Sequence, residues 1–262
     1  MKIYKAYAKV NIFLKITGIR ANYHEIISRF MRVDSLYDEL SFVSKESEEF
    51  KIIGDFSCTT EQNTIYKAYI YLLDSLDEAL SVSLQNLMQK YAVHVKKNIP
   101  AFAGLGGGSS DAATFLKMCN EVLHLGLSQN ELAIVGLKVG ADVPFFVYGF
   151  DSANVGGIGE VVEEFREPLL DFEVFTPKIE ISTPKVYAVY RENFFAPIDG
   201  FKTNELKTTT SYDILKKMSI DEANDLFKPA LQEYRELKNY YKQGYYFSGS
   251  GSSFFKVKEK EK

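Results

Sequence analysis

The chain has 262 residues, of which 46% are hydrophobic and 25% charged, and its formal net charge is −4. This composition excludes a disordered chain, and the length provides for one large domain or two smaller ones. The negative charge argues against nucleic acid as a partner, and no apolar run reaches the roughly 18–20 residues that cross a bilayer. The two cysteines, Cys58 and Cys119, are too few for a disulfide framework. The N-terminus does not resemble a signal peptide, so we expect a cytoplasmic protein without a membrane partner.

In the first 150 residues, period-two alternation of apolar and polar residues predicts strands, and helical spacing of apolar residues predicts helices. The predicted strands cover 1–15, 29–45 and 91–100, and the predicted helices cover about 62–76, 80–91, 111–125 and 128–142. Asp34 and Asp38 are predicted turn residues inside the second strand. Ser128 and Glu131 have the spacing of a capping box at the start of the last helix. Cys119 falls on the apolar stripe of its helix, so we interpret it as a core residue.

The second half opens with a composition break over 146–160, rich in Gly, Ser and Asn. It predicts a domain boundary, and the predicted domains are 1–153 and 154–262. Further along, the pattern predicts a strand near 173–182, helices around 184–193, 211–218 and 221–240, and a closing strand pair around 245–257. Strands and helices mix without regular βαβ alternation and without an internal repeat, which predicts an α+β fold in two parts.

The segment PAFAGLGGGSSDAA, residues 100–113, holds four glycines and two serines within seven residues. It lies between a predicted strand and a predicted helix, whereas a flexible linker has no defined neighbours. In that context, converging backbone amides and a helix N-terminus bind phosphate, and Ser109 or Ser110 can cap the helix or reach a phosphate or metal. It is not a P-loop, because no lysine follows Gly108, and the dinucleotide fingerprint also fails. A tight turn without a ligand is the alternative.

This string resembles the second signature of the GHMP kinases, a superfamily of small-molecule kinases that cradle the phosphates of ATP in this loop. AYAKVNIFLKITG near the N-terminus resembles the first signature, and FSGSGSSFF at 247–255 resembles the third. The three stand in the expected order over most of the chain. The resemblance implies a two-lobed GHMP-kinase-like fold with its active site in the cleft between the lobes, and ATP and Mg²⁺ as cofactors.

The resemblance also implies a set of ATP-binding residues. Those of the loop are Pro100, Ala101, Phe102, Ala103, Gly104, Leu105, Gly106, Gly107, Gly108, Ser109 and Ser110. Asn63 and Lys97 are weaker candidates for contacts to the adenosine. The chain departs from the expected pattern at residues 101–103, where smaller or more glycine-rich residues are usual.

ANYHEIISRFMRVDSLYDEL, residues 21–40, resembles the segment that follows the first signature in the 4-diphosphocytidyl-2-C-methylerythritol kinases, one family of the superfamily. LKVGADVPFFVYG, GGIGE, STPKVY and NDLFKPA continue this resemblance in order. That family phosphorylates the 2-hydroxyl of diphosphocytidyl-methylerythritol with ATP, on the non-mevalonate route to isoprenoid precursors. The resemblance therefore implies a small-molecule substrate that carries a cytosine base.

Residue by residue, Asp142 matches the family's catalytic aspartate and Lys9 its partner. A carboxylate beside the hydroxyl accepts its proton, and an ammonium keeps that carboxylate ionised and attracts the transferred phosphoryl group. The implied substrate-binding residues are Asn11, Tyr23, His24, Phe30, Thr183 and Tyr187. His24 matches the residue that reads the base, and the aromatic side chains pack its ring, with Tyr187 at a position that is often Phe.

Two alternatives compete with this interpretation. The first is another kinase of the superfamily, acting on homoserine, mevalonate or a sugar. These substrates have no base that could stack on Tyr23 and the other aromatic side chains. A nucleotide-binding regulator without catalysis predicts the loss of Lys9 or Asp142, and both are present. A metal enzyme is disfavoured because three scattered histidines make no ligand cluster, and no metal ligand is assigned. We expect a monomer or a weak homodimer.

Overall fold

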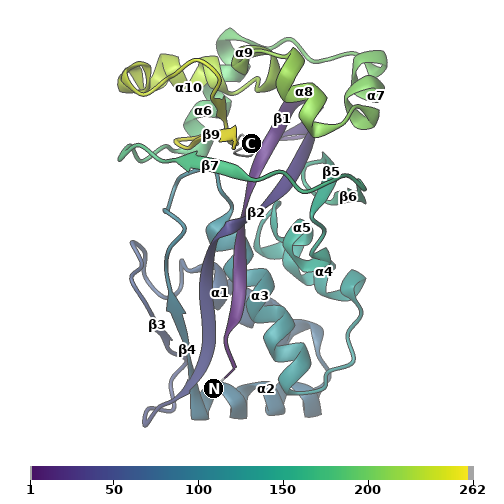
Figure 1. Cartoon of the computed structure of the whole chain (residues 1–262). Coiled ribbons are helices and arrows are strands. Elements are labelled where there is room, and N and C mark those ends of the chain that lie inside the picture. Colours follow the sequence, from purple (N-terminus) through teal and green to yellow (C-terminus); the bar gives the residue numbers. More distant parts are fainter. Residues whose placement is uncertain (1, 259–262) are drawn as a thin grey trace. The chain divides into compact units, whose positions relative to one another are not determined.

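A computed structural model describes residues 2–258 (Figure 1). Its mixed helices and strands confirm the predicted α+β class. Contacts group the chain into two compact units: the first comprises Met1–Ala8, Leu36–Ile99 and Gly106–Gly149, and the second Lys9–Ser35, Pro100–Leu105 and Phe150–Lys262. Each unit is assembled from several segments, and the predicted division into domains 1–153 and 154–262 stays a prediction. Residues 1 and 259–262, at the ends of those domains, lie outside the described residues.

The two long N-terminal strands, β1 (Tyr4–Arg20) and β2 (Tyr23–Ser44), contribute residues to both units. Both extend beyond their predicted ranges. The turns predicted at Asp34 and Asp38 are wrong, because β2 runs through both residues without a break. Asp38 is fully buried, and its carboxylate accepts hydrogen bonds from the backbone N–H groups of residues 98 and 99. These partners lie about sixty positions away, where a local pattern cannot reveal them.

In the first unit, the second half of β2 pairs antiparallel with β4 (Tyr91–Lys96), and the two-residue β3 (Ile52–Ile53) pairs parallel with β4. The helices are α1 (Thr64–Ser75), α2 (Glu78–Lys90), α3 (Gly107–Val122), α4 (Gln129–Val139) and α5 (Val143–Tyr148). α3 packs against α1, α4 and α5 (Figure 1). The predicted capping box is confirmed, since Ser128 and Glu131 bond each other at the start of α4. The buried Cys119 confirms its assignment to the core.

α3 begins four residues before its predicted start, so the last glycines of the loop belong to its first turn. The N-cap is Gly106, whose φ of 73° is left-handed, a conformation that glycine adopts without strain. The capping role predicted for Ser109 or Ser110 is wrong, because both already lie inside the helix and no side chain caps it. The backbone N–H groups of this first turn therefore have no partner within the helix.

In the second unit, the first half of β2 pairs antiparallel with β5 (Ser152–Gly157), which pairs with β6 (Val161–Glu164). A separate sheet has the order β7 (Phe172–Phe175), β9 (Phe254–Val257), β8 (Tyr246–Phe247). The helices are α6 (Thr183–Asn193), α7 (Gly200–Thr208), α8 (Ser211–Lys217), α9 (Ile220–Ala223), α10 (Phe227–Glu233) and the 3₁₀ helix η1 (Arg235–Asn239).

The predicted helix over 221–240 is wrong as a single element, since α9, α10 and η1 divide it. The division begins at Asn224, whose side-chain oxygen accepts a hydrogen bond from the backbone N–H of Leu226. Asparagine competes with helical hydrogen bonding in this way. The strand predicted over 173–182 ends at residue 175.

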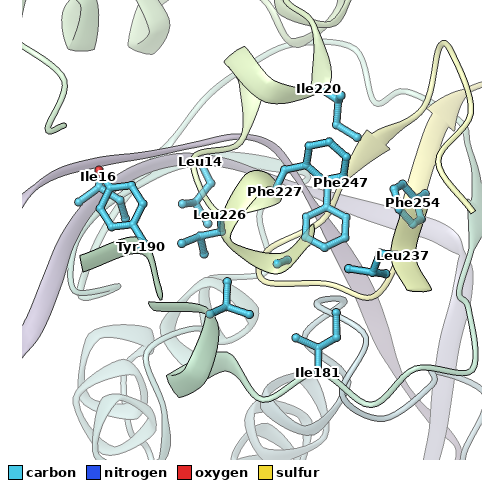
Figure 2. Packing of buried hydrophobic residues seen from close by; sticks show 12 residues of the cluster. Leu14, Ile16, Ile181, Tyr190, Ile220, Leu226, Phe227, Leu237, Phe247 and Phe254 are labelled. Carbon is cyan, nitrogen blue, oxygen red and sulfur yellow. The ribbon is translucent and has the colours of Figure 1, made fainter. Parts of the chain in front are cut away.

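Figure 2 shows the hydrophobic cluster of the second unit, to which β1, α6, α10 and the β8–β9 pair contribute. Its labelled members are Leu14, Ile16, Ile181, Tyr190, Ile220, Leu226, Phe227, Leu237, Phe247 and Phe254. All are at most 4% exposed. Phe247 and Phe254 flank the segment 248–253 of FSGSGSSFF, which we call the third glycine-rich motif. Burial of these two rings fixes both ends of that segment.

Candidate active site

The first half of the glycine loop, Pro100–Leu105, belongs to the second unit and is held by backbone contacts. The backbone N–H of Lys9 donates to the carbonyl of Leu105 at 3.0 Å, and Ser248 Oγ donates to the carbonyl of Gly104 at 2.8 Å. Gly104 has a φ of 72°, and a Cβ there would lie 2.1 Å from the carbonyl oxygen of Ser248. Only glycine fits this close approach of the loop to the third glycine-rich motif.

The second half of the loop belongs to the first unit and forms the start of α3. Thr64 Oγ1 donates to the carbonyl of Gly108 at 2.6 Å, and a Cβ at Gly107 would lie 2.9 Å from Ile99 Cγ2. The glycines thus let the backbone of the first turn pack closely. First-turn N–H groups without partners inside the helix, together with the positive end of a 16-residue helix, favour an anion at this point.

The two residues predicted at the adenosine have other bonds in this structure. Asn63 is the N-cap of α1, and its side-chain oxygen accepts from the N–H of Ile65 at 2.9 Å. The ammonium of Lys97 binds Asp38 and lies 2.7 Å from Asp111 Oδ2. Burial alone would lower the pKa of Lys97, but the two carboxylates raise it above its ordinary value. Their role toward a nucleotide stays a prediction.

Asp142 lies in the first unit as the N-cap residue of α5, and its side chain does not cap that helix. Pro144 at the second helical position favours a helix start here, since its ring presets φ. At the other end of α5, the partly buried ammonium of Lys117 on α3 donates to the carbonyl of Phe146 at 2.9 Å. Burial lowers the pKa of Lys117. The position of Asp142 therefore depends on how α5 is held.

Lys9 and Asn11 lie side by side on β1 in the second unit, 3% and 1% exposed. The Lys9 ammonium donates to Asn11 Oδ1 at 2.6 Å and lies 4.4 Å from the centroid of the Phe30 ring. Asn11 Nδ2 donates to Ser28 Oγ at 2.9 Å. Burying a lysine side chain is costly without such partners, and the hydrogen bond and the cation–π contact offset part of that cost.

The predicted base-reading residues are also in the second unit. The His24 ring lies 4.9 Å from that of Tyr187, centroid to centroid, and Nε2 of His24 is buried without a hydrogen-bond partner among the described residues. Thr183, the first residue of α6, shares a 2.7 Å hydrogen bond with Ser250 of the third motif. Tyr23 is 64% exposed. The structure thus brings His24 to Tyr187, and Lys9 to Asn11 and Phe30.

Sequence reasoning missed several polar residues that support these groups. Ser248 and Ser250 lie in the FSGSGSSFF motif at 247–255, whose pattern does not single out individual serines. Asp111 directly follows the two serines of the loop, which was a usable signal. Ser28 and Asp38 carried none, because each is defined by a partner on another strand or segment.

Comparison with known proteins places this arrangement in a family. The sequence model of the GHMP kinases N terminal domain matches residues 63–150. A 4-diphosphocytidyl-2-C-methyl-D-erythritol kinase from Sulfurimonas denitrificans is 76% identical over 262 residues, 100% of this chain and 98% of that protein. One from a Sulfurovum species is 44% identical over 97% of this chain and 98% of its own length. The chain belongs to the 4-diphosphocytidyl-2-C-methyl-D-erythritol kinase family.

The structural comparison agrees with this membership. A crystal structure of 4-(cytidine 5'-diphospho)-2C-methyl-D-erythritol kinase has a TM-score of 0.73 at 28% identity, covering 98% of this chain and 90% of that one. The mevalonate kinase of Methanococcus jannaschii has a TM-score of 0.54 at 16% identity, covering 98% and 90%, which shows the shared fold alone. The predicted superfamily and the GHMP-kinase fold are confirmed. As a GHMP kinase, the protein uses ATP as phosphate donor.

Two observations bear on other classes of protein. Within residues 2–258, no three His, Cys, Asp or Glu side chains gather as a ligand set for a metal ion. No helix in the described part of the chain is long and apolar enough to span a membrane.

Proposed function

We propose that this protein transfers the γ-phosphoryl group of ATP to the 2-hydroxyl of 4-diphosphocytidyl-2-C-methyl-D-erythritol, in the non-mevalonate pathway to isoprenoid precursors. The observation that carries the proposal is the 76% identity, over the whole chain, to a kinase named for this substrate. Two features of the geometry support it: the first turn of α3 has backbone N–H groups without partners inside the helix, and the His24 ring lies against that of Tyr187.

On the donor side, the proposal assigns the triphosphate to the glycine loop, Pro100–Ser110. The first-turn N–H groups of α3 are suited to phosphate oxygens, and Gly104, Gly107 and Gly108 keep the backbone free of side chains there. Asn63 and Lys97 belong to this side as proposed nucleotide contacts. Phosphoryl transfer asks the protein mainly for positioning and charge neutralisation, and this loop supplies both.

On the acceptor side, the proposal assigns the proton of the 2-hydroxyl to the carboxylate of Asp142. The acceptor oxygen then bonds to the γ-phosphorus, the bond from that phosphorus to the bridging oxygen breaks, and ADP leaves. Lys9 supplies positive charge for the developing alkoxide and the transferred group. Its ammonium is already oriented by Asn11 and Phe30, so little reorganisation is needed.

We also propose that the ATP is used with Mg²⁺, which would offset part of the negative charge of the phosphates when bound. Since the described residues form no three-ligand cluster, phosphate oxygens and water would supply most of its ligands. The cytosine is assigned to His24 and to the rings of Tyr187, Tyr23 and Phe30, with Asn11 and Thr183 as further substrate contacts. A cytoplasmic monomer or weak homodimer completes the proposal, and light scattering tests the oligomeric state.

ADP release from Mg-ATP tests the substrate assignment, with the cytidyl substrate compared with homoserine, mevalonate and galactose. We expect turnover with the cytidyl substrate alone. Turnover with another acceptor would leave the fold assignment standing and contradict the proposed cytosine site. Nucleotide binding without turnover on any acceptor would favour the alternative of a nucleotide-binding regulator without catalysis. The base assignment is tested separately: Asp142→Asn should keep ATP binding and lower kcat by about 10²–10⁴-fold, the usual contribution of a general base. Full activity of this variant would remove that role.

A further inference from the structure

Three charged residues of the first unit, all buried or nearly so, lie at the two ends of the glycine loop. Lys97 follows β4 and precedes the loop, Asp111 lies on α3 after the loop, and Asp38 is on β2. The Lys97 ammonium binds Asp38 and Asp111, with 2.7 Å to Asp111 Oδ2. A single ammonium thus joins the strand that enters the loop to the helix that leaves it.

Asp38 fixes the start of the loop. It is fully buried, and its Oδ1 accepts from the backbone N–H of Asn98 at 2.5 Å and of Ile99 at 2.8 Å. With Oδ2 on Lys97, both oxygens of this carboxylate are used. The segment that leads into Pro100 is therefore tied to Asp38 by three hydrogen bonds, two of them from consecutive backbone amides.

Asp111 holds the end of the loop at a cost. It is 1% exposed, and its Oδ1 has no hydrogen-bond partner among the described residues. Burial raises its pKa to about 7, although the ammonium of Lys97 lowers it. A half-satisfied buried carboxylate destabilises the fold, and such groups persist where function requires them.

The Lys97 ammonium also lies close to Gly107, the first residue of α3. A Cβ on Gly107 would lie 3.6 Å from Lys97 Nζ and 2.9 Å from Ile99 Cγ2. Two residues that precede the loop therefore lie against the backbone at the helix start, and a shift of Lys97 would shift the first-turn N–H groups.

We propose that Asp38, Lys97 and Asp111 form a clamp that fixes the two ends of the glycine loop and so preorganises the first-turn amides of α3 for the phosphates of ATP. The proposal rests on the proposed role of the loop. The three are positioning residues, because they act on phosphate through the backbone. Their task differs from the adenosine contact predicted for Lys97, and binding experiments with adenosine and ATP separate the two.

The experiment measures dissociation constants of ATP and adenosine, and KM for both substrates, in variants of the full chain. In Asp111→Ala, the loss of one charge-assisted hydrogen bond should weaken ATP binding about tenfold or more and leave adenosine binding within about twofold. Asp111→Asn keeps a neutral acceptor for Lys97 and should recover part of the loss. Lys97→Met should behave like Asp111→Ala. The matched control is Lys96→Met, which removes an exposed lysine paired with Glu39 and should change neither constant.

A variant that folds poorly lowers kcat with the active fraction but leaves KM for ATP unchanged, so the KM measurement separates positioning from damage. Both residues act through one clamp. The double variant Asp111→Ala, Lys97→Met should therefore weaken ATP binding no more than the more damaging of the two single variants. Equal losses of ATP and adenosine binding in Lys97→Met, with normal ATP binding in Asp111→Ala, would overturn the clamp. Gly107→Val tests the loop itself: if this variant binds ATP normally, the proposed phosphate site fails, and the clamp with it.

Discussion

The imidazole of His24 lies against the ring of Tyr187, with 4.9 Å between centroids and 34° between planes. Tyr190 contacts the same imidazole edge-on at 5.8 Å. Burial, and to a lesser extent Arg191, lower the pKa of His24 below 6.5. At neutral pH the ring is therefore uncharged and packed on one side, and its buried Nε2 has no partner within the described chain. Such a nitrogen suits the polar edge of a base.

His24→Phe keeps an aromatic ring beside Tyr187 and removes both ring nitrogens. Leaving the polar groups of a bound base unpaired costs about 1–3 kcal/mol, so KM for the cytidyl substrate should rise roughly 5- to 150-fold. KM for ATP should stay constant, as should kcat at saturation. Steady-state kinetics with each substrate varied in turn measures this. Tyr187→Phe, which keeps the ring face, is the control and should change KM by less than about twofold. An unchanged KM in His24→Phe would exclude base reading by His24.

The same site gives a pH dependence of defined sign. Protonation of His24 removes its acceptor nitrogen, so affinity for the acceptor substrate should fall as pH falls through the lowered pKa, below about 6.5. KM measured from about pH 5 to 8 should show this rise on the acid side in the natural protein and a flatter profile in His24→Phe. Equal profiles would assign the acid effect to another group.

Much of the site followed from local sequence. The glycine string, the Lys9–Asn11 spacing and the Tyr23–His24 pair are contiguous motifs, so a single stretch of chain carries each signal. The helices α1 and α4 were also predictable, because apolar spacing and the Ser128–Glu131 capping box are local. In all of these, the residues that define a feature are neighbours in the chain.

The predictions that proved wrong concern residues whose structure depends on partners far away in the sequence. Asp38 looked like a turn residue, but its amide and ammonium partners lie about sixty positions away, and they turn a polar residue into a buried strand residue. The start of α3 was misplaced because glycines disfavour helices by propensity, whereas packing of Gly107 on Ile99 and of Gly108 on Thr64 requires them there. Tertiary contacts overrode the local preference in both cases.

Asp111 predicts how stability varies with pH. Its folded pKa is raised to about 7 from 3.8, so between these values the folded state holds a proton that the unfolded state has lost. Its contribution to stability is fully present below pH 3.8 and is lost as pH rises toward about 7. Asp111→Asn removes this titration, so its stability relative to the natural protein should increase from about pH 4 to 7. Urea unfolding at several pH values measures the difference, and a constant difference would contradict the raised pKa. Burial is the main cause of the raised pKa of Asp111; among its charged neighbours, Lys97 lowers this pKa and Asp38 raises it.

Replacing Lys117 should affect the stability and the activity of the protein differently. Its partly buried ammonium donates to a carbonyl near the end of the helix that begins after Asp142. Lys117→Met removes a partly buried charge that is costly to desolvate, so the unfolding midpoint should not fall. It also releases α5, so kcat should drop about tenfold if Asp142 is the base, with both KM values nearly constant. Lys138→Met, on the exposed side of α4, is the control. A normal kcat in Lys117→Met would show that α5 needs no such anchor.

Asn224 supports the third glycine-rich motif from a distance. It is 2% exposed, and its Nδ2 donates to the carbonyls of Phe247 and Gly249, both at 2.9 Å. Asn224→Asp keeps the shape but sets an acceptor-only carboxylate against two carbonyl oxygens. Leaving these buried groups unpaired should lower the free energy of unfolding by about 2–5 kcal/mol, measured by urea denaturation. Asn224→Ala should cost less, since it adds no charge. Because Ser248 in this motif holds both Asn11 and Gly104, folded Asn224→Ala should also lose activity. If Asn224→Asp proves no less stable than Asn224→Ala, the amide does not face the two carbonyls as an obligate donor.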